Sequence, residues 1–186
     1  LSVISQVEDM SFPWITVVTD LVTVHHVWFN NNATICTVPT EAVKEIALDA
    51  GLQPDQIINT GIPVDPKISN LQQIKKEDIR KELGWNQNKT TVLVVGSPRV
   101  KSIMQYIDAL DDSEQDIQFA LVAGGNEELY QKFLGAELDH PTSVYDFVEN
   151  LPEMMRAADM IICKAGGLIV TESLSSGLPM ILIHML

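Results

Sequence analysis

The sequence predicts an α/β protein whose parallel β-sheets carry helices on both faces. Strand-like runs such as "VLVV" (92–95) and "FALV" (119–122) are apolar at every position, as in strands that are buried on both sides. Helical patterns separate these runs along most of the chain, which is the alternation that builds parallel sheets. Glycines and prolines between the runs mark the turns.

The first part, residues 1–66, contains three predicted strands and one predicted helix. The strands cover 14–19, 34–38 and 56–60. Thr40 is expected to cap a helix over 41–50, and Gly51 is expected to end it. The stiff, irregular connector "GIPVDP" (61–66) then marks a domain boundary.

The second part, residues 67–186, continues the alternation. Predicted strands cover 90–96, 117–125, 143–148, 159–163 and 180–186. Predicted helices cover 75–83, 103–110, 127–138 and 152–158, with a short one between Gly167 and Gly177. Gly84 is expected to stop the first of these helices, and Pro152 suits the first turn of the fourth.

Composition and charge exclude several classes of protein. The 186 residues are 46% hydrophobic and carry a net charge of −13, so a real core is expected and nucleic acid is disfavoured as a partner. No apolar run reaches the ~18 residues that a membrane span needs. Cys36 and Cys163 lie in strand-like runs and are predicted to be buried free thiols. Since the chain opens on Leu1 and ends within "MILIHML", we expect a piece of a longer protein.

Ligands of parallel α/β sheets bind beyond the carboxyl ends of the strands, on the strand-to-helix loops. This rule selects four loops in the second part and one in the first. They are 96–102, 124–126, 148–150, 164–168 and 20–32.

The loop "KAGGL" (164–168) opens a helix directly after an apolar strand. The first amides of a helix lack intrahelical partners and glycines allow close approach, so this loop suits a phosphate or diphosphate. A helix packed tightly on its sheet through small residues explains the same glycines. Glu172, one turn after Leu168, is placed either to bind a sugar diol or to face solvent near a helix start.

The first-part loop "DLVTVHHVWFNNN" holds the candidate acid–base residues. Asp20 follows a buried strand, and His25 and His26 follow it; histidine titrates near neutral pH. The same histidines also suit an ordinary loop in which they only cap or fill space. Trp28 and Phe29 are either core residues or an apolar lip for an acceptor. The sequence contains no His, Cys and Asp cluster at metal-ligand spacing.

Taken together and in order, these motifs resemble GT-B glycosyltransferases of the monogalactosyldiacylglycerol synthase type. That group is related to the processive diacylglycerol glucosyltransferases and to the peptidoglycan N-acetylglucosaminyltransferase. "TDLVTVHHVWF", "CTVPTEAV" and "TGIPVDP" resemble the family's Thr-Asp-Leu…His-x-x-Trp-Phe run, its Val-Pro-Thr/Ser-Glu helix start and its interdomain connector. "DFVENLPEMMRAADMIICKAGGLIVTESLSSGLP" resembles the donor-binding segment.

The resemblance covers most of the chain and implies two Rossmann-like domains that face a cleft. Residues 1–66 match an incomplete, acceptor-side N-terminal domain, and residues 67–186 match a truncated donor-binding domain. His25 matches the histidine near the acceptor side, and Asp20 is a second catalytic candidate. The donor-binding residues are expected to be Gly96, Ser97, Arg99, Gly124, Phe147, Val148, Gly166, Gly167, Leu168, Ile169 and Glu172.

Three roles follow for the donor-binding residues from the same resemblance. Phe147 and Val148 match the strand end that meets the uracil ring. Residues 166–169 match the helix start whose amides meet the diphosphate. Glu172 matches the carboxylate that binds the ribose hydroxyls.

The sequence also departs from the family pattern. Ile169 stands where the family usually has a hydroxyl residue, and "GSPRVKS" (96–102) replaces a glycine-rich loop, although Ser97, Arg99 and Lys101 can still meet a phosphate. The family's Gly-Gly-Gly-His loop, with its expected catalytic base, and its Pro-Gly-Gln-Glu motif, which holds the donor sugar, do not occur in these 186 residues.

The resemblance implies an inverting, metal-independent transfer of a hexose from a UDP-sugar to a lipid acceptor, with diacylglycerol expected. No cofactor is expected, because the UDP-sugar is a substrate, and the location is expected to be cytoplasmic with peripheral contact at the inner membrane face. The alternatives are a peptidoglycan-type N-acetylglucosaminyltransferase, a GT-B epimerase, or a UDP-sugar-binding fragment without turnover. The "TDLVTVHHVWF" run favours the lipid enzyme.

Overall fold

The computed structural model describes residues 12–97, 100 and 102–183. Contacts within the chain divide it into two compact units, Leu1–Pro63 and Val64–Leu186. The division falls inside the "GIPVDP" connector. Each unit contains its own parallel sheet.

The first unit is built on a three-stranded sheet. Its strands are β1 (Ile15–Val17), β2 (Ile35–Val38) and β3 (Ile57–Asn59), paired in that order. Two short 3₁₀ helices, η1 (His26–Trp28) and η2 (Pro54–Gln56), lie in the connections before β2 and β3. The predicted strands are in place, although they are one to three residues shorter than expected.

The helix α2 (Glu41–Asp49) covers one face of this sheet. The Thr40 hydroxyl accepts a hydrogen bond from the Val43 amide at 3.2 Å, and Gly51 follows the helix with a φ of +98°. The predicted cap and stop of α2 are therefore confirmed. On the opposite face of the described sheet, Ile15 and Ile58 remain 62% and 44% exposed.

The second unit is built on a five-stranded parallel sheet. Its order is β6 (Thr142–Tyr145), β5 (Ile117–Val122), β4 (Thr90–Val95), β7 (Met160–Lys164) and β8 (Met180–Ile183). The helices are α3 (Lys67–Leu71), α4 (Lys76–Leu83), α5 (Ile103–Asp111), α6 (Glu127–Leu134), α7 (Leu151–Ala157) and α8 (Gly167–Ser175).

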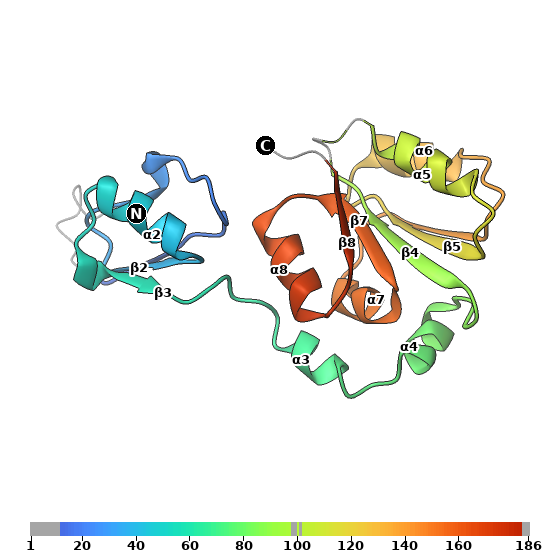
Figure 1. Ribbon diagram of the computed structural model, residues 1–186, viewed down its shortest axis with the longest axis horizontal. Coiled ribbons are helices and arrows are strands. Elements are labelled where there is room, and N and C mark those ends of the chain that lie inside the picture. Colours follow the sequence, from blue (N-terminus) through green and yellow to red (C-terminus); the bar gives the residue numbers. More distant parts are fainter. Residues whose placement is uncertain (1–11, 98–99, 101, 184–186) are drawn as a thin grey trace. The chain divides into compact units, whose positions relative to one another are not determined.

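Helices cover both faces of this second sheet, as predicted. Successive side chains of a strand point to opposite faces. Leu93 therefore packs with residues of α4 and α7, whereas its neighbours Val92 and Val94 pack with residues of α5 and α6. Figure 1 shows α7 and α8 on one side of the sheet and α5 and α6 on the other.

A network of charged residues lies at the amino-terminal edge of the second sheet. Arg80 is 5% exposed, and its guanidinium forms an ion pair with Asp159 and donates to the Ala157 carbonyl oxygen at 2.8 Å. Lys76 and the Thr91 amide also donate to the Asp159 carboxylate, each at 2.8 Å. Burial alone would raise the pKa of Asp159, but these donors outweigh it and lower the pKa.

The observed elements differ from the predicted ones in a few places. β6 ends at Tyr145 rather than 148, because the Asp146 carbonyl turns to accept the amide of Gly124 at 2.8 Å. α6 ends at Leu134, where Gly135 costs more in a helix than other residues. The sequence pattern predicts no helix at Lys67–Leu71, where the five-residue α3 lies. The end of the predicted strand 180–186 lies outside the described residues.

The two cysteines are confirmed as buried free thiols. Cys36 lies under α2, and Cys163 lies in the core beside α7. None of the helices in the described part is both long and apolar enough to cross a lipid bilayer.

Candidate functional site

The connections of the second sheet reverse direction at its centre. From β4 the chain passes through α5 to β5, over the face that α5 and α6 cover. From β7 it passes through α8 to β8, over the opposite face. Since β4 and β7 are paired neighbours, their carboxyl ends form the topological switch point, where parallel α/β sheets bind ligands.

The helix α8 begins at this switch point without a side-chain cap. Its N-cap residue, Gly166, has extended φ and ψ of −106° and 140° and places no side chain over the helix start. The Gly166 amide donates to the Lys164 carbonyl oxygen at 2.8 Å, and Val170 begins the helical bonding to Gly166 at 3.0 Å. The amides of residues 167–169 therefore precede the first helical bond and remain suited to an anion.

The glycine at position 166 is required neither by the backbone nor by packing. Its φ of −106° is one that any residue adopts, so the backbone does not require glycine. A Cβ at Gly166 would lie 3.7 Å from Ile169 Cγ2, which is ordinary van der Waals contact. Tight packing of α8 therefore does not explain Gly166, and the ligand-binding interpretation of this glycine gains support.

Gly96, at the end of β4, differs from Gly166 because packing leaves little room for a side chain there. A Cβ there would lie 2.3 Å from Leu129 Cδ2 and 3.1 Å from the Val122 carbonyl oxygen. Packing against β5 and α6 accounts for Gly96 without a ligand. Its predicted donor contact stays a prediction, while its structural role is plain.

Glu172 lies on the second turn of α8 and is half-buried. Burial is the main cause that raises the pKa of its carboxyl group, and the charge of Asp65 adds to the effect. Among the described residues, Glu172 has no hydrogen-bond or ion-pair partner. A partly desolvated carboxylate that lacks a partner is suited to accept hydrogen bonds from the two hydroxyls of a sugar diol.

The loops after β5 and β6 lie against each other. The amides of Gly124 and Gly125 donate to the Asp146 carbonyl oxygen at 2.8 and 3.4 Å. A Cβ on Gly125 would lie 3.9 Å from Phe147 Cδ2, so the ring is next to this glycine turn. The Phe147 side chain is 70% exposed, whereas Val148 packs against the core. The two predicted uracil contacts thus differ, and Phe147 is the one with an open aromatic face.

Ile169 directs its side chain into the same core as Val148. The nearby hydroxyls do not replace the missing one, because Thr171 donates to the Gly167 carbonyl oxygen at 2.8 Å and Ser173 donates to the Ile169 carbonyl oxygen at 2.7 Å. Phosphate contacts at the start of α8 would therefore come from the backbone. Leu168, in contrast, is 51% exposed.

The structure adds two residues that sequence reasoning did not single out. Asp65, in the connector, lies near enough to influence Glu172, and its carboxylate caps α3 by accepting from the Lys67 amide at 2.8 Å. Lys164 ends β7 at the switch point. Its place directly before "AGG" was the available signal, whereas no local pattern pointed to Asp65.

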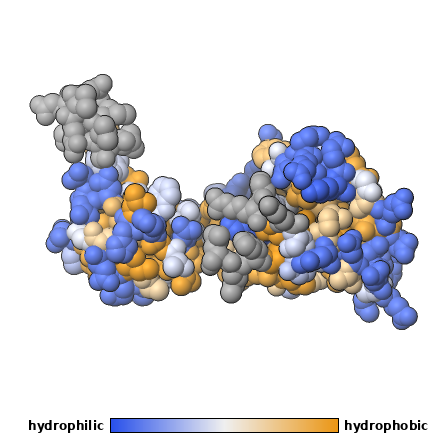
Figure 2. Space-filling view, turned by 90° about the horizontal axis from the view of Figure 1, so that it is seen from above, coloured by the Kyte–Doolittle hydropathy of each residue, from blue (hydrophilic) through white to orange (hydrophobic). Residues whose placement is uncertain are grey.

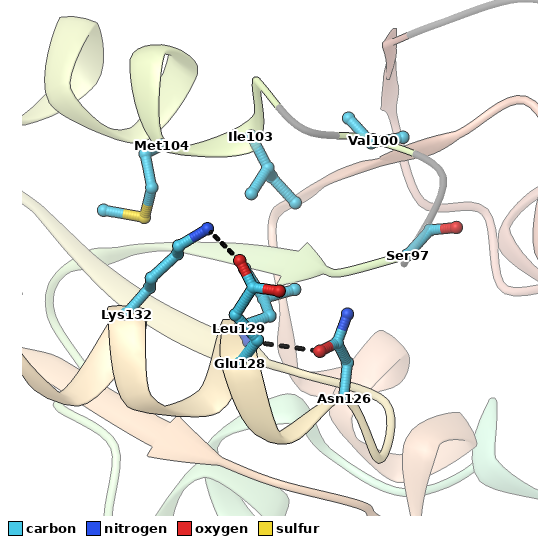
Figure 3. A pocket seen from close by; sticks show the side chains of 8 residues that line it. All are labelled: Ser97, Val100, Ile103, Met104, Asn126, Glu128, Leu129 and Lys132. Carbon is cyan, nitrogen blue, oxygen red and sulfur yellow. Dashed lines mark hydrogen bonds and ion pairs between the residues drawn. The ribbon is translucent and has the colours of Figure 1, made fainter.

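A cavity of about 320 Å³ lies close to the β4–α5 loop (Figure 3). It is lined by Ser97, Val100, Ile103, Met104, Asn126, Glu128, Leu129 and Lys132. Lys132 and Glu128 form an ion pair at 2.7 Å, and the Asn126 side chain caps α6 through the Leu129 amide. Ser97 is the one predicted donor residue in this lining, so the cavity does not coincide with the start of α8. Arg99 and Lys101 lie outside the described residues.

In the first unit, the candidate acid–base residues lie in an exposed loop. The His25 ring caps η1, because its Nδ1 accepts the Val27 amide at 3.2 Å. In the neutral ring this bond places the proton on Nε2, which makes the exposed nitrogen a donor. Asp20 and His26 are exposed as well. Trp28 is 62% exposed while Phe29 is 7% exposed, so Phe29 belongs to the core and Trp28 to the surface.

Comparison with known proteins places both parts of the chain in glycosyltransferase families. Residues 1–64 match the family Monogalactosyldiacylglycerol (MGDG) synthase. Residues 90–185, more than half of the chain, match the Glycosyltransferase family 28 C-terminal domain.

Individual relatives agree with these matches. Monogalactosyldiacylglycerol synthase of Spinacia oleracea is 37% identical over 175 residues, which cover 90% of this chain and 33% of the spinach protein. Processive diacylglycerol beta-glucosyltransferase of Bacillus pumilus is 31% identical over 175 residues, which cover 91% of this chain and 44% of that enzyme. The chain thus spans a third to under a half of these relatives.

Solved structures share the fold. Anabaena Alr3699/HepE, crystallised with UDP-glucose, superposes with a TM-score of 0.62 at 18% identity over 96% of this chain and 55% of that one. Acinetobacter baumannii MurG superposes with a TM-score of 0.57 at 18% identity over 98% of this chain and 48% of that one. The fold is that of GT-B glycosyltransferases, and the chain belongs to glycosyltransferase family 28.

Proposed function

We propose that this chain is part of an enzyme that transfers a hexose from a UDP-sugar to diacylglycerol. The observation that carries the proposal is the start of α8, where uncapped amides follow Gly166, a glycine that packing does not require. Glu172, which has no hydrogen-bond or ion-pair partner among the described residues, follows about one turn later. A diphosphate at the amides and a ribose diol at Glu172 fit this order along the helix. The spinach relative is named for the synthesis of monogalactosyldiacylglycerol and the Bacillus relative as a diacylglycerol glucosyltransferase, and both names support the lipid acceptor.

The proposed reaction is an inverting displacement that needs no metal ion and no cofactor. As the bond between sugar and diphosphate breaks, negative charge grows on the leaving UDP. The amide dipoles at the start of α8 are fixed in place before the reaction and favour that charge. A general base must take the proton of the acceptor hydroxyl. His25 remains a candidate contact to the acceptor, with its Nε2 proton as a hydrogen-bond donor.

The transfer reaction is tested with the longer protein that contains these residues. The protein is incubated with UDP-galactose or UDP-glucose and diacylglycerol vesicles, and the glycolipid is identified by mass spectrometry. We expect transfer of one of these hexoses with inversion at the anomeric carbon. Intact UDP binding without transfer to diacylglycerol would contradict the proposed reaction while leaving a nucleotide-binding role in place.

We also propose peripheral contact with the cytoplasmic face of a membrane through the loop around η1. Val22, Val27 and Trp28 in this loop are 67%, 72% and 62% exposed. Figure 2 shows hydrophobic surface between hydrophilic patches. With a net charge of −13, the chain would be repelled by anionic lipid, so apolar insertion has to supply the attraction.

Vesicle flotation tests the proposed membrane contact. Trp28→Ser should reduce binding to neutral phosphatidylcholine vesicles severalfold, because an interfacial indole is lost. The control is Trp14→Ser, which removes another tryptophan outside this loop. Equal binding of Trp28→Ser and the unmodified chain would contradict a contact through this loop.

A further inference from the structure

We infer that Lys164 is the side chain that binds the diphosphate of the UDP-sugar, opposite the amides of α8. This inference rests on the proposed function and names a charged partner for the backbone amides within the described part of the chain. Lys164 is the sole cationic side chain in the described loops at the carboxyl edge of the second sheet. These loops are residues 96–97, 123–126, 146–150 and 164–166.

The position of Lys164 follows from strand pairing. β7 pairs with β4 up to Val95 and Cys163, so Lys164 lies one step further along, beside Gly96 and at the switch point. On its other side Lys164 pairs with Ile183 of β8. Lys164 therefore lies on a central strand, flanked by a neighbour on each side, at the edge where ligands bind.

The direction of the side chain follows from alternation along β7. Cys163 belongs to the core under α7, whereas Ile162 belongs to the core under α5 and α6. Lys164 therefore starts toward the α5 side, as does its partner Ile183. The helix α8 leaves β7 on the opposite side, so the ammonium group and the α8 amides approach the switch point from its two sides.

The charge of Lys164 is not used within the described part of the chain. Its ammonium group forms no hydrogen bond or ion pair with any described residue, and the side chain is partly buried. The other partly buried lysines that the structure describes are paired, as Lys76 with Asp159 and Lys89 with Asp116. Among the described residues, the other charges near this edge, Asp146, Glu149 and Glu172, are acidic.

A dianionic ligand at this edge would need a cation. The chain carries a net charge of −13, and a diphosphate meets the repulsion of these carboxylates unless a positive group offsets it. The α8 amides supply only the partial charge of a helix start. A lysine ammonium is a compact point charge with three donors, suited to phosphate oxygens.

The test compares UDP with uridine, because uridine has the base and ribose but no phosphate. Titration calorimetry is run at low salt on the 186-residue chain and on Lys164→Met, Lys164→Arg and Lys81→Met. Lys81 is an exposed lysine of α4, so Lys81→Met makes the same charge change away from the switch point. Thermal unfolding confirms that each variant is folded.

We expect Lys164→Met to weaken UDP binding about tenfold and to leave uridine binding within about twofold. Lys164→Arg should keep most of the UDP affinity, and Lys81→Met should match the unmodified chain. The loss in Lys164→Met should shrink as salt is added, because salt screens the charge.

Two results would overturn the inference. Unchanged UDP affinity in Lys164→Met would show that the ammonium does not contact the phosphates. An equal loss for UDP and uridine would place Lys164 at the nucleoside instead. If the unmodified chain binds neither compound, the proposed nucleotide site itself is wrong, and the role of Lys164 falls with it.

Discussion

At the scale of one residue, the ionised carboxylate of Glu172 in the candidate site lowers the stability of the folded chain. Its carboxyl group is half-buried without a cationic partner, and burial followed by the charge of Asp65 raises its pKa. A raised pKa means that folding favours the protonated form. The ionised form therefore lowers the stability of the folded chain once the pH rises through the folded-state pKa.

Glu172→Gln should separate stability from binding. We expect a higher melting temperature than that of the unmodified chain at pH 7, and a difference that fades below pH 4, where Glu172 is protonated in both states. UDP and uridine should both bind more weakly, because the ribose contact is lost. The control is Glu82→Gln on the exposed surface of α4. A destabilised Glu172→Gln at pH 7 would indicate an unrecognised structural role.

The two glycines at the switch point should respond differently to substitution. Gly96→Ala places a Cβ 2.3 Å from Leu129 Cδ2, so we expect destabilisation of about 1–3 kcal/mol in urea unfolding. Gly166→Ala meets only ordinary contact and should unfold like the unmodified chain. Gly166→Val adds bulk in front of the α8 amides and should abolish UDP binding in a folded protein. Retained UDP affinity in Gly166→Val would exclude a ligand at this turn.

The thiols should be inert in the native protein. Cys36 and Cys163 are 0% and 1% exposed, and burial raises the pKa of Cys163 to about 11. Since the thiolate is the reactive form, Ellman's reagent at pH 8 should react with neither cysteine until denaturant is added. Rapid reaction of one thiol without denaturant would show that the strand carrying it opens readily.

At the scale of elements, the two edges of the second sheet have different tasks. The carboxyl edge carries the candidate site, and the amino edge carries the Arg80–Asp159 network that joins α4 to β7. Arg80 also donates to the carbonyl oxygens of Gln87 and Lys89, so its guanidinium orders the segment before β4. The network therefore fixes the sheet from the edge opposite the candidate site.

Asp159→Asn should destabilise the fold and spare binding. It removes the charge opposite a buried guanidinium, which costs about 3 kcal/mol. Because the folded-state pKa of Asp159 is lowered, its contribution is present above the unfolded pKa and is lost as the pH falls through the folded one. Urea unfolding at pH 7 and pH 3 should show a smaller difference at pH 3. UDP affinity at pH 7 should be unchanged, and a large loss would mean that the two edges are coupled.

The elements that the sequence predicted well are those with strong local patterns. The strands β4, β5 and β7 consist of apolar runs, and α2 and α4 carry their own cap or stop at Thr40 and Gly84. α3 was missed because "KISNL" is too short to show helical periodicity. The end of β6 was misplaced because the bond from Gly124 to Asp146 joins two distant loops.

At the scale of the whole molecule, the sequence predicts the main residues of the candidate site but not the contacts that they make in the folded chain. The order of the motifs pointed to the start of α8, to Glu172 and to Phe147. The burial of Glu172 near Asp65, the packing role of Gly96 and the inward turn of Ile169 depend on contacts between segments far apart in the sequence. Such contacts appear only when the chain is folded.

The central claim is that the second unit binds UDP at the start of α8. The most direct test is amide chemical-shift mapping of the 186-residue chain by NMR during titration with UDP. We predict saturable shifts at Gly166, Gly167, Leu168 and Ile169, with further shifts near Phe147 and Glu172. Shifts confined to the cavity between α5 and α6, or no shifts at millimolar UDP, would contradict the claim.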